Sequence, residues 1–224
     1  MDESTLKSDE ADGPRDAHGR LPEPGSITTI SGVYINPTKA RPEQITPYDI
    51  AHALSLVNRY AGHSLFAYSV AQHSVLLHDF IRNRASYQNG TYRIMPAFGG
   101  EQEFGVEIRK QALMHDATEG YIADIGGPFK FEFPDYLRHE AQLNAVIAER
   151  FSISPDHHPW LKFLDKAITN NEMEVLAKRG SWSAKYRALG FLPGVTIEQW
   201  TPEYARARFL SCFRALWPHE TVSL

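Results

Sequence analysis

Cysteine is almost absent from this chain. The single cysteine, Cys212, cannot form an intramolecular disulfide, which is typical of a reducing compartment, so we expect a cytoplasmic protein. One cysteine also excludes cysteine-rich zinc and iron–sulfur sites, which need several thiolates. A bound metal ion would therefore need histidine and carboxylate ligands, and the chain carries 10 histidines and 27 acidic residues.

Long apolar runs and a surplus of basic charge are missing too. No stretch approaches about 18 consecutive apolar residues, and no basic start precedes an apolar run, so we expect neither a transmembrane helix nor a signal peptide. The 23 Lys and Arg residues against 27 Asp and Glu residues give a net charge of −4. Proteins that bind nucleic acids or anionic membranes through general charge carry a basic surplus. We therefore expect neither partner.

The 224 residues, 42% of them hydrophobic, are enough for one domain with extensions. Residues 1–26 have few large apolar side chains, so we expect a disordered or loosely attached arm. Residues 27–224 would form one helical domain with a helical C-terminal extension at 180–224. Residues 84–104 contain Asn-Gly, Met-Pro and Gly-Gly and predict a long loop insertion. It is either a functional lid or a tolerated surface insertion.

Helical spacing of apolar residues dominates the rest of the sequence. Thr46 and Pro47 suit the cap and first position of a helix that ends near 60–62, and Thr201 and Pro202 start the last helix in the same way. Further helices are expected at 65–81, 107–124, 136–151 and 160–179. Residues 27–35 favour a short hairpin or extended segment. The sequence thus predicts an all-α fold with a short extended N-terminal segment.

The segment LMHDATEGYIAD at 113–124 holds the most distinctive polar pattern. Glu119 follows His115 by four residues and Asp116 by three, so all three groups can lie on neighbouring parts of one helix. A His-Asp pair alone means little, because His78-Asp79 is a second one. It has no acidic companion at the next turn, so we expect it at a solvated helix end.

Two further polar residues interrupt apolar helical stretches. His73 follows Ala71 and precedes Val75, and Asp165 lies in the apolar sequence FLDKAI. A buried histidine needs partners for its ring nitrogens, and a buried carboxylate is costly unless it is paired or binds a metal. His73 can be a satisfied core histidine, and Asp165 can pair with a neighbouring lysine. Convergence with the 115–116 pair on one ion explains these positions together.

The order His73, His115-Asp116, Asp165 resembles the HD-domain metal-dependent phosphohydrolases. His115-Asp116-x-x-Glu119 followed by residues 124–128 (DIGGP) and Lys130 is similar, more narrowly, to bacterial 5′-deoxynucleotidases and phage dATP triphosphohydrolases. The resemblance covers about residues 45–180. It implies an HD-domain helical bundle.

The resemblance also implies one divalent transition metal ion, bound by His73, His115, Asp116 and Asp165. Mixed nitrogen and oxygen ligands suit Zn, Co, Mn, Ni or Fe(II), and residue types do not choose among them. The ion would polarise the phosphate and activate water near pH 7. We expect a nucleotide as the substrate.

Roles for the remaining residues are likewise implied by the resemblance. Glu119 would orient or deprotonate the attacking water, Asp124 would protonate the departing O5′, and Arg59 would orient the phosphate. Tyr60 would lie beside the nucleoside. The substrate-binding residues implied are Arg59, Tyr60, His73, Asp116, Asp124, Ile125, Gly126, Gly127, Lys130 and Asp165. Gly126-Gly127 replaces a proline and a small hydroxyl residue that relatives often have, and Tyr60 replaces a common tryptophan. These differences bear on base and sugar selectivity.

The function expected from the resemblance is hydrolysis of deoxynucleotides at the 5′-phosphate, with dNTPs, dATP in particular, favoured over dNMPs as substrates. A 5′-deoxynucleotidase acting on dNMPs is the alternative. An HD-type di-iron oxygenase would need extra ligands such as His78 or His63, and a degenerate regulatory HD module would not need both Glu119 and Asp124.

The last helix carries many aromatic residues, namely Tyr204, Phe209, Phe213 and Trp217. Its apolar surface suggests a homo-oligomer, although a simple core helix explains it equally well.

Overall fold

The computed structural model describes residues 14–84, 86–88, 91–93, 105–177 and 188–222. The described chain is predominantly helical, in agreement with the all-α prediction. The helices are α1 (Pro47–Leu56), α2 (Val70–Arg84), α3 (Val106–Met114), α4 (Glu119–Ile122), α5 (Gly127–Lys130), α6 (Pro134–Phe151), α7 (Pro159–Leu176) and α9 (Pro202–Leu216). Three short 3-10 segments add to them: η2 (Pro37–Lys39), η3 (Pro42–Gln44) and η4 (Arg59–Gly62). No described helix is long and apolar enough to cross a membrane.

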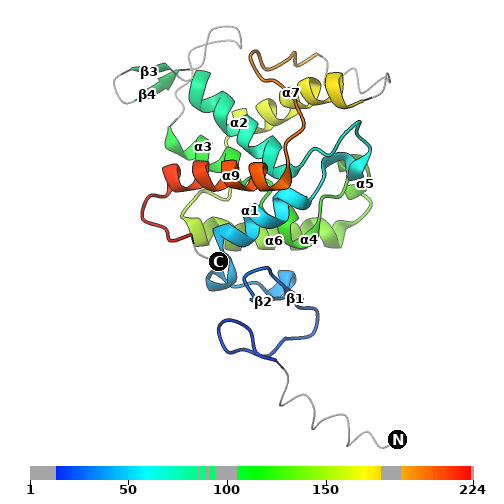
Figure 1. The fold of residues 1–224 in the computed structure, drawn as a ribbon, viewed down its shortest axis with the longest axis vertical. Coiled ribbons are helices and arrows are strands. Elements are labelled where there is room, and N and C mark those ends of the chain that lie inside the picture. Colours follow the sequence, from blue (N-terminus) through cyan, green and yellow to red (C-terminus); the bar gives the residue numbers. More distant parts are fainter. Residues whose placement is uncertain (1–13, 85, 89–90, 94–104, 178–187, 223–224) are drawn as a thin grey trace, which may run out of the picture.

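The centre of the molecule is built from α1, α2, α3 and α9. Helix α9 packs against α1 and α2, and α2 also packs against α3 (Figure 1). Phe209, Phe213 and Trp217 are buried in this core, and the Trp217 indole donates a hydrogen bond to the Phe151 carbonyl at the end of α6. Only Tyr204 of the aromatic series is exposed. Three of the four aromatic residues that suggested self-association therefore lie inside the chain.

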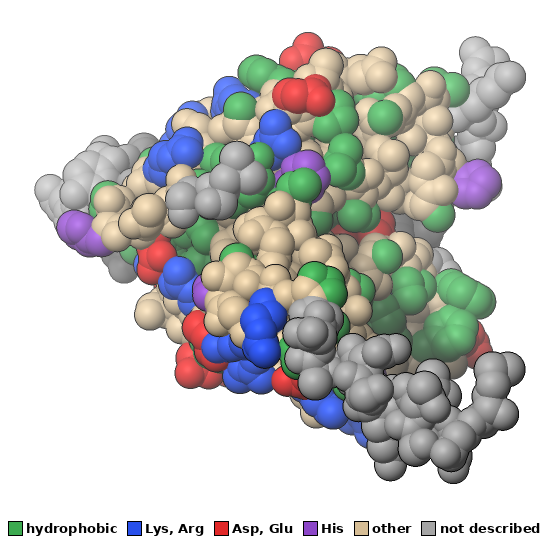
Figure 2. Space-filling view, turned by 60° about the horizontal axis from the view of Figure 1, so that its bottom comes forward, with side chains coloured by type: hydrophobic (Ala, Val, Ile, Leu, Met, Phe, Trp, Pro, Cys, Tyr) green, Lys and Arg blue, Asp and Glu red, His purple; other side chains and the backbone are tan. Residues whose placement is uncertain are grey.

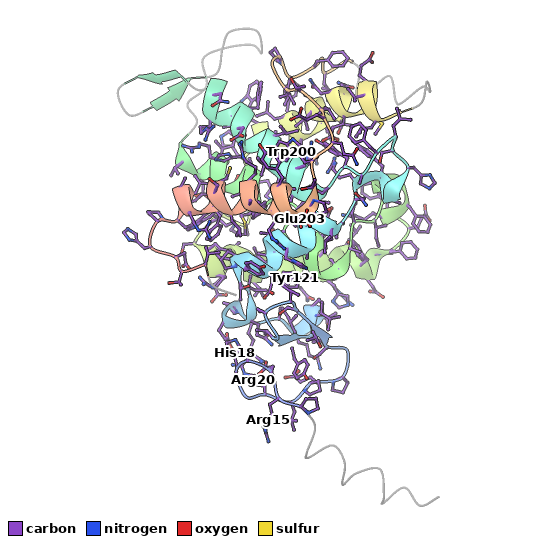
Figure 3. All side chains as sticks on the ribbon, in the orientation of Figure 1. Arg15, His18, Arg20, Tyr121, Trp200 and Glu203 are labelled. Carbon is purple, nitrogen blue, oxygen red and sulfur yellow. The ribbon has the colours of Figure 1, made fainter. Side chains whose placement is uncertain are left out.

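Both capped helix starts are confirmed. The Thr46 hydroxyl accepts a hydrogen bond from the Asp49 amide at the start of α1, and Thr201 accepts one from the Tyr204 amide at the start of α9 (Figure 3 labels the adjacent Trp200 and Glu203). Each threonine satisfies one of the amides that a helix start leaves without a partner. A proline follows each cap, where the missing N–H costs nothing.

The sequence predicts that α1 ends later and that α2 begins earlier than the structure shows. Helix α1 ends at Leu56, and the stretch to residues 60–62 that was predicted to continue it is η4 instead, with Tyr60 and Ala61 at positive φ of 59° and 50°. Helix α2 begins at Val70, not at residue 65. The left-handed residues turn the chain so that it leaves the helical body and returns. The apolar periodicity across this turn therefore belongs to loop residues that still contact the core.

The N-terminal part of the chain forms an extension at one end of the helical body (blue in Figure 1), where Arg15, His18 and Arg20 lie (Figure 3). Asp16 is buried there and accepts hydrogen bonds from the backbone amides of His18, Arg20 and Tyr34. The predicted hairpin is present, because β1 (Ile27–Thr28) pairs antiparallel with β2 (Tyr34–Ile35). Residues 1–13 of the expected arm lie outside the described residues.

The expected loop at 84–104 is partly wrong. Strands β3 (Ser86–Gln88) and β4 (Thr91–Arg93) pair antiparallel, with Gln88 opposite Thr91. Asn-Gly, the sequence at 89–90, is strongly preferred in two-residue hairpin connections, although these two residues lie outside the described ones. The prediction treated this dipeptide as a loop breaker. The rest of the predicted loop, residues 94–104, lies outside the described residues.

Candidate metal centre

The predicted helix at 107–124 is broken in the middle. Helix α3 ends at Met114 and α4 starts at Glu119. Between them the backbone bonds span three residues, from the Ala117 amide to the Met114 carbonyl and from the Glu119 amide to the Asp116 carbonyl, both at 3.0 Å. This tighter winding brings residues three apart almost into line along the axis. His115 and Asp116 therefore lie at the junction between α3 and α4, which we call the corner.

Four side chains from three segments meet at this corner. The His73 Nε2 atom of α2 lies 3.2 Å from the His115 Nε2 atom and 3.2 Å from an Asp165 carboxylate oxygen of α7. His115 Nε2 lies 3.1 Å from an Asp116 oxygen. The two remaining histidine–aspartate separations are 3.8 Å. The structure thus brings together all four residues expected as metal ligands.

The hydrogen bonds of the two histidines test whether a cation fits here. His115 Nδ1 lies 2.9 Å from the Ala112 carbonyl, and His73 Nδ1 lies 2.6 Å from a Glu172 carboxylate oxygen. Both partners are acceptors, so each Nδ1 carries a proton, and in neutral rings both Nε2 atoms present lone pairs. Two lone pairs facing each other at 3.2 Å would repel, so either one ring carries a second proton or a metal ion lies between them. Donors bound about 2.1 Å from one tetrahedral ion lie about 3.4 Å apart. His73, His115 and Asp165 have the spacing to share one divalent ion, and Asp116 lies 3.1 Å from His115 beside them.

In the metal-free site, a proton on His115 balances the carboxylates, and a metal ion would have to displace it. Burial acts against charge on His115, but Asp116 and Asp165 outweigh it and raise the pKa of His115 well above its ordinary value. Burial likewise opposes ionisation of Asp116, yet the His115 ring lowers the pKa of that carboxyl to about 2. The two carboxylates therefore stay ionised and attract positive charge. The Asp165 side chain is 33% exposed, so the site is accessible from solvent.

Glu172 is a site residue that the sequence reading missed. It lies on α7 two turns after Asp165 and is fully buried. Besides His73, it accepts hydrogen bonds from the hydroxyls of Tyr60 and Tyr68. Its spacing of seven residues from Asp165 places both on one helical face, which was the only available signal in the sequence.

Arg59 joins Glu172 to the ligand quartet. Its guanidinium lies 3.4 Å from the Asp116 carboxylate and 3.3 Å from the Glu172 carboxylate, and only 14% of the side chain is exposed. Tyr60 follows it in the left-handed turn of η4, with the Arg59 guanidinium 5.4 Å from its ring centre. Arg59 is thus fixed beside the site with a planar group suited to phosphate.

Glu119 and Asp124 are the two carboxyl groups expected to handle protons. Glu119 is 6% exposed, and one of its oxygens has no hydrogen-bond partner among the described residues. Burial, assisted by the charges of Asp116 and Asp124, raises the pKa of Glu119 to about 9. Burial also raises the pKa of the half-buried Asp124. In the metal-free protein both groups therefore bind protons more readily than ordinary carboxyls.

A cavity of about 780 Å³ opens onto the quartet. Its lining includes His115, Asp116, Lys130, Asn144, His157, Lys162 and Asp165. Figure 2 shows that the molecule is hollowed on one side, with hydrophobic side chains at the rim. Lys130 forms an ion pair of 2.7 Å with Glu140. Of the predicted substrate-binding residues, only Asp116, Lys130 and Asp165 line this cavity. The others do not: Arg59, Tyr60, His73, Asp124, Ile125, Gly126 and Gly127.

Other histidines and the cysteine lie elsewhere. His78 is 1% exposed within α2, and Asp79 beside it pairs with Arg208, so the expectation of a solvated helix end is wrong. Helix α2 continues to Arg84 and packs against α9, which covers this pair. His63 is exposed after η4, and neither His63 nor His78 reaches the quartet. Cys212 is buried, and burial raises the pKa of its thiol to about 11.

Comparisons with known proteins add relatives but no activity. No family model matches the chain. Over 150 residues it is 37% identical to the uncharacterized protein YfdR of Escherichia coli (strain K12), an alignment that covers 67% of this chain and 71% of the relative. Over 127 residues it is 30% identical to the uncharacterized protein RCAP_rcc00048 of Rhodobacter capsulatus, which covers 55% of this chain and 57% of that relative.

Proposed function

The chain belongs to the family of the Escherichia coli protein YfdR, and we propose that it is a metal-dependent phosphohydrolase of the HD type that cleaves nucleotides at the 5′-phosphate. One observation carries the proposal: His73, His115, Asp116 and Asp165 converge, with the two Nε2 atoms only 3.2 Å apart, at an open cavity. A divalent ion held by these residues would neutralise phosphoryl charge and favour the deprotonation of water.

Glu119 and Asp124 take the proton-handling roles. Glu119 is buried three residues after Asp116, and its free oxygen can accept a hydrogen bond from a water molecule at the quartet. Asp124 is half-buried with a raised pKa, so it can hold a proton and deliver it to the leaving oxygen. A cation bound at the quartet would favour the ionised form of Glu119, three residues after Asp116, and would so separate the protonation states of the two carboxyls.

Three basic side chains lie at or near the cavity, but four carboxyl groups also line it (Asp116, Glu140, Asp156 and Asp165), so an anionic substrate would depend on the bound cation. Arg59 lies at the quartet, and Lys130 and Lys162 line the cavity beyond it. The volume of about 780 Å³ is within the usual range for small-molecule sites, about 300–1,000 Å³. Because Lys130 and Lys162 add basic groups to a cavity of this size, we propose deoxynucleoside triphosphates, dATP in particular, as the preferred substrates. Deoxynucleoside monophosphates are the alternative, since both reactions cut next to O5′.

The test is an assay that resolves phosphate from triphosphate. Protein freed of metal with a chelator is reloaded with Zn²⁺, Co²⁺, Mn²⁺, Ni²⁺ or Fe²⁺ and given each deoxy- and ribonucleoside mono- and triphosphate. We expect metal-dependent release of triphosphate, fastest from dATP. Release of phosphate from monophosphates, with no cleavage of triphosphates, would favour the alternative, a 5′-deoxynucleotidase that acts on dNMPs. Turnover that is unaffected by the chelator would refute the proposal, and equal rates with ribonucleotides would refute the preference for deoxyribose.

Two aspartate variants provide the matched comparison. Asp165→Asn removes one charged ligand at the cavity and is expected to reduce turnover to background. Asp135→Asn makes the same chemical change on a side chain that is 86% exposed at the start of α6. It should retain wild-type turnover, so loss in both variants would point to general damage to the protein.

A further inference from the structure

The carboxylate of Glu172 is fully buried, and several donor groups surround it. One oxygen lies 2.6 Å from His73 Nδ1 and 3.0 Å from the Tyr68 hydroxyl. The other accepts from the Tyr60 hydroxyl and lies 3.3 Å from Arg59 Nε. One oxygen therefore faces two hydrogen-bond donors, and the other accepts one hydrogen bond and forms an ion pair with Arg59, whose Nε has no hydrogen-bond partner among the described residues.

We propose that Glu172 is the positioning residue of the metal centre: it fixes the ring of His73 with Nε2 toward the ion and holds Arg59 beside the same site. The inference rests on the metal site of the proposed function, but not on its substrate. Glu172 itself contacts neither the ion position nor the cavity, so it acts through His73 and Arg59.

The hydrogen-bonding capacity of the carboxylate explains why this position needs glutamate. A carboxylate only accepts, so it keeps the proton of His73 on Nδ1 and leaves the Nε2 lone pair for a metal. A glutamine at 172 must place its NH₂ group at one of the two oxygen positions. Facing His73, the NH₂ group would favour the opposite tautomer, whose Nε2–H cannot bind a metal. If the NH₂ group instead faced Arg59, it would point its N–H bonds at those of the guanidinium, and two donors cannot form a hydrogen bond with each other.

The first experiment measures Co²⁺ affinity of the metal-free protein by competition with a chromophoric chelator, without nucleotide. Glu172→Gln should bind Co²⁺ about 10–100-fold more weakly than the wild type, the usual cost of losing a partner that orients a ligand. Glu174→Gln, the same change on an exposed residue of the same helix, should bind as the wild type does. Circular dichroism and thermal melting of each metal-free variant check the fold. A folded Glu172→Gln variant with wild-type affinity would overturn the proposal.

The second experiment needs no variant and so remains decisive if Glu172→Gln does not fold. The ¹⁵N shifts of the histidine rings in wild-type protein report which nitrogen carries the proton. We expect His73 to be protonated at Nδ1 and to bind Zn²⁺ through Nε2. A proton on Nε2, or a failure to bind Zn²⁺ or Co²⁺, would overturn the proposal. Metal binding with the expected tautomer but no nucleotide turnover would refute the proposed function alone.

Discussion

Gly120 lies where the site helix α4 approaches α1 most closely. A Cβ atom built on Gly120 would lie 3.3 Å from the Ala53 methyl group and 3.6 Å from a Leu54 methyl group. The Ala53 methyl cannot rotate away, so any side chain at 120 must separate the two helices. Glu119 is the preceding residue, and its position therefore depends on this contact.

Substitutions of increasing size at Gly120 give a graded prediction. Gly120→Ala gains about 0.5–1 kcal/mol from the higher helix propensity of alanine. This gain offsets the free energy lost when the two helices move apart by a few tenths of an ångström. The free energy of unfolding should therefore change by no more than about 1 kcal/mol. Gly120→Val adds two more methyl groups to a filled space and should cost about 1–3 kcal/mol. At about 2–4 °C per kcal/mol for a chain of this length, the melting temperature should fall by about 2–12 °C.

Thermal melting and turnover measured together test this reasoning. Gly120→Ala should melt near the wild type yet show a lower kcat for the best nucleotide, because α4 carries Glu119 away from the quartet. Gly105→Ala is the control, since a Cβ there meets only a backbone atom at 4.0 Å. Wild-type melting and turnover in Gly120→Val would refute the close approach of α4 to α1.

Three other predictions concern the metal, an ion pair and a helix cap. Zn²⁺ at about 100 times its Kd should stabilise metal-free protein by about 2.7 kcal/mol, and Asp116→Ala should abolish this shift in thermal melting. Arg150 makes two hydrogen bonds to the Glu220 carboxylate and lowers its pKa below the ordinary 4.5. The stabilisation is thus present above about pH 4.5 and lost as pH falls through the lower pKa of the folded state. Solvent screening limits it to about 0.5–1 kcal/mol in urea unfolding. Thr201→Ala should cost about 1 kcal/mol by removing the cap of α9.

Each of these has an outcome that contradicts it. A Zn²⁺-induced melting shift of equal size in Asp116→Ala would place the ion elsewhere. Glu220→Gln should remove part of the acid sensitivity, so an unchanged dependence on pH between about 3 and 6 would show that the ion pair contributes nothing. Thr201→Ser keeps the hydroxyl and should melt close to the wild type, whereas a loss equal to that of Thr201→Ala would indicate a packing effect.

Local signals in the sequence predicted most helices well. The caps at Thr46 and Thr201 depend on contacts within three residues, and the apolar faces of α6 and α7 repeat at helical spacing over 18 residues each. Such features involve neighbours along the chain, so they are readable without the rest of the fold. The convergence of the ligand quartet was suggested by the polar residues His73 and Asp165 within apolar helical stretches, and the family resemblance added the order of the ligands.

The failures have a common physical origin in tertiary contacts. Helical periodicity continues through residues 115–118, yet the chain tightens there because the 115–116 pair must face α2 and α7 at once. Periodicity also continues past Leu56, where Tyr60 and Ala61 turn into the left-handed region. The burial of Glu172 is invisible in sequence, since acidic residues are almost always exposed.

These departures from local preference lie around the quartet, and each of them has a free-energy cost of folding. Two left-handed residues, a tightened helix corner and a fully buried glutamate each oppose folding. Together they bring Asp116 and Glu172 within 3.4 Å of the Arg59 guanidinium. Among the described side chains at this corner, the remaining negative charge is met by protons, as the raised pKa values of His115 and Glu119 show. A divalent cation would replace those protons, so its affinity should rise with pH. A nucleotide would then be attracted by this local charge, despite the net charge of −4.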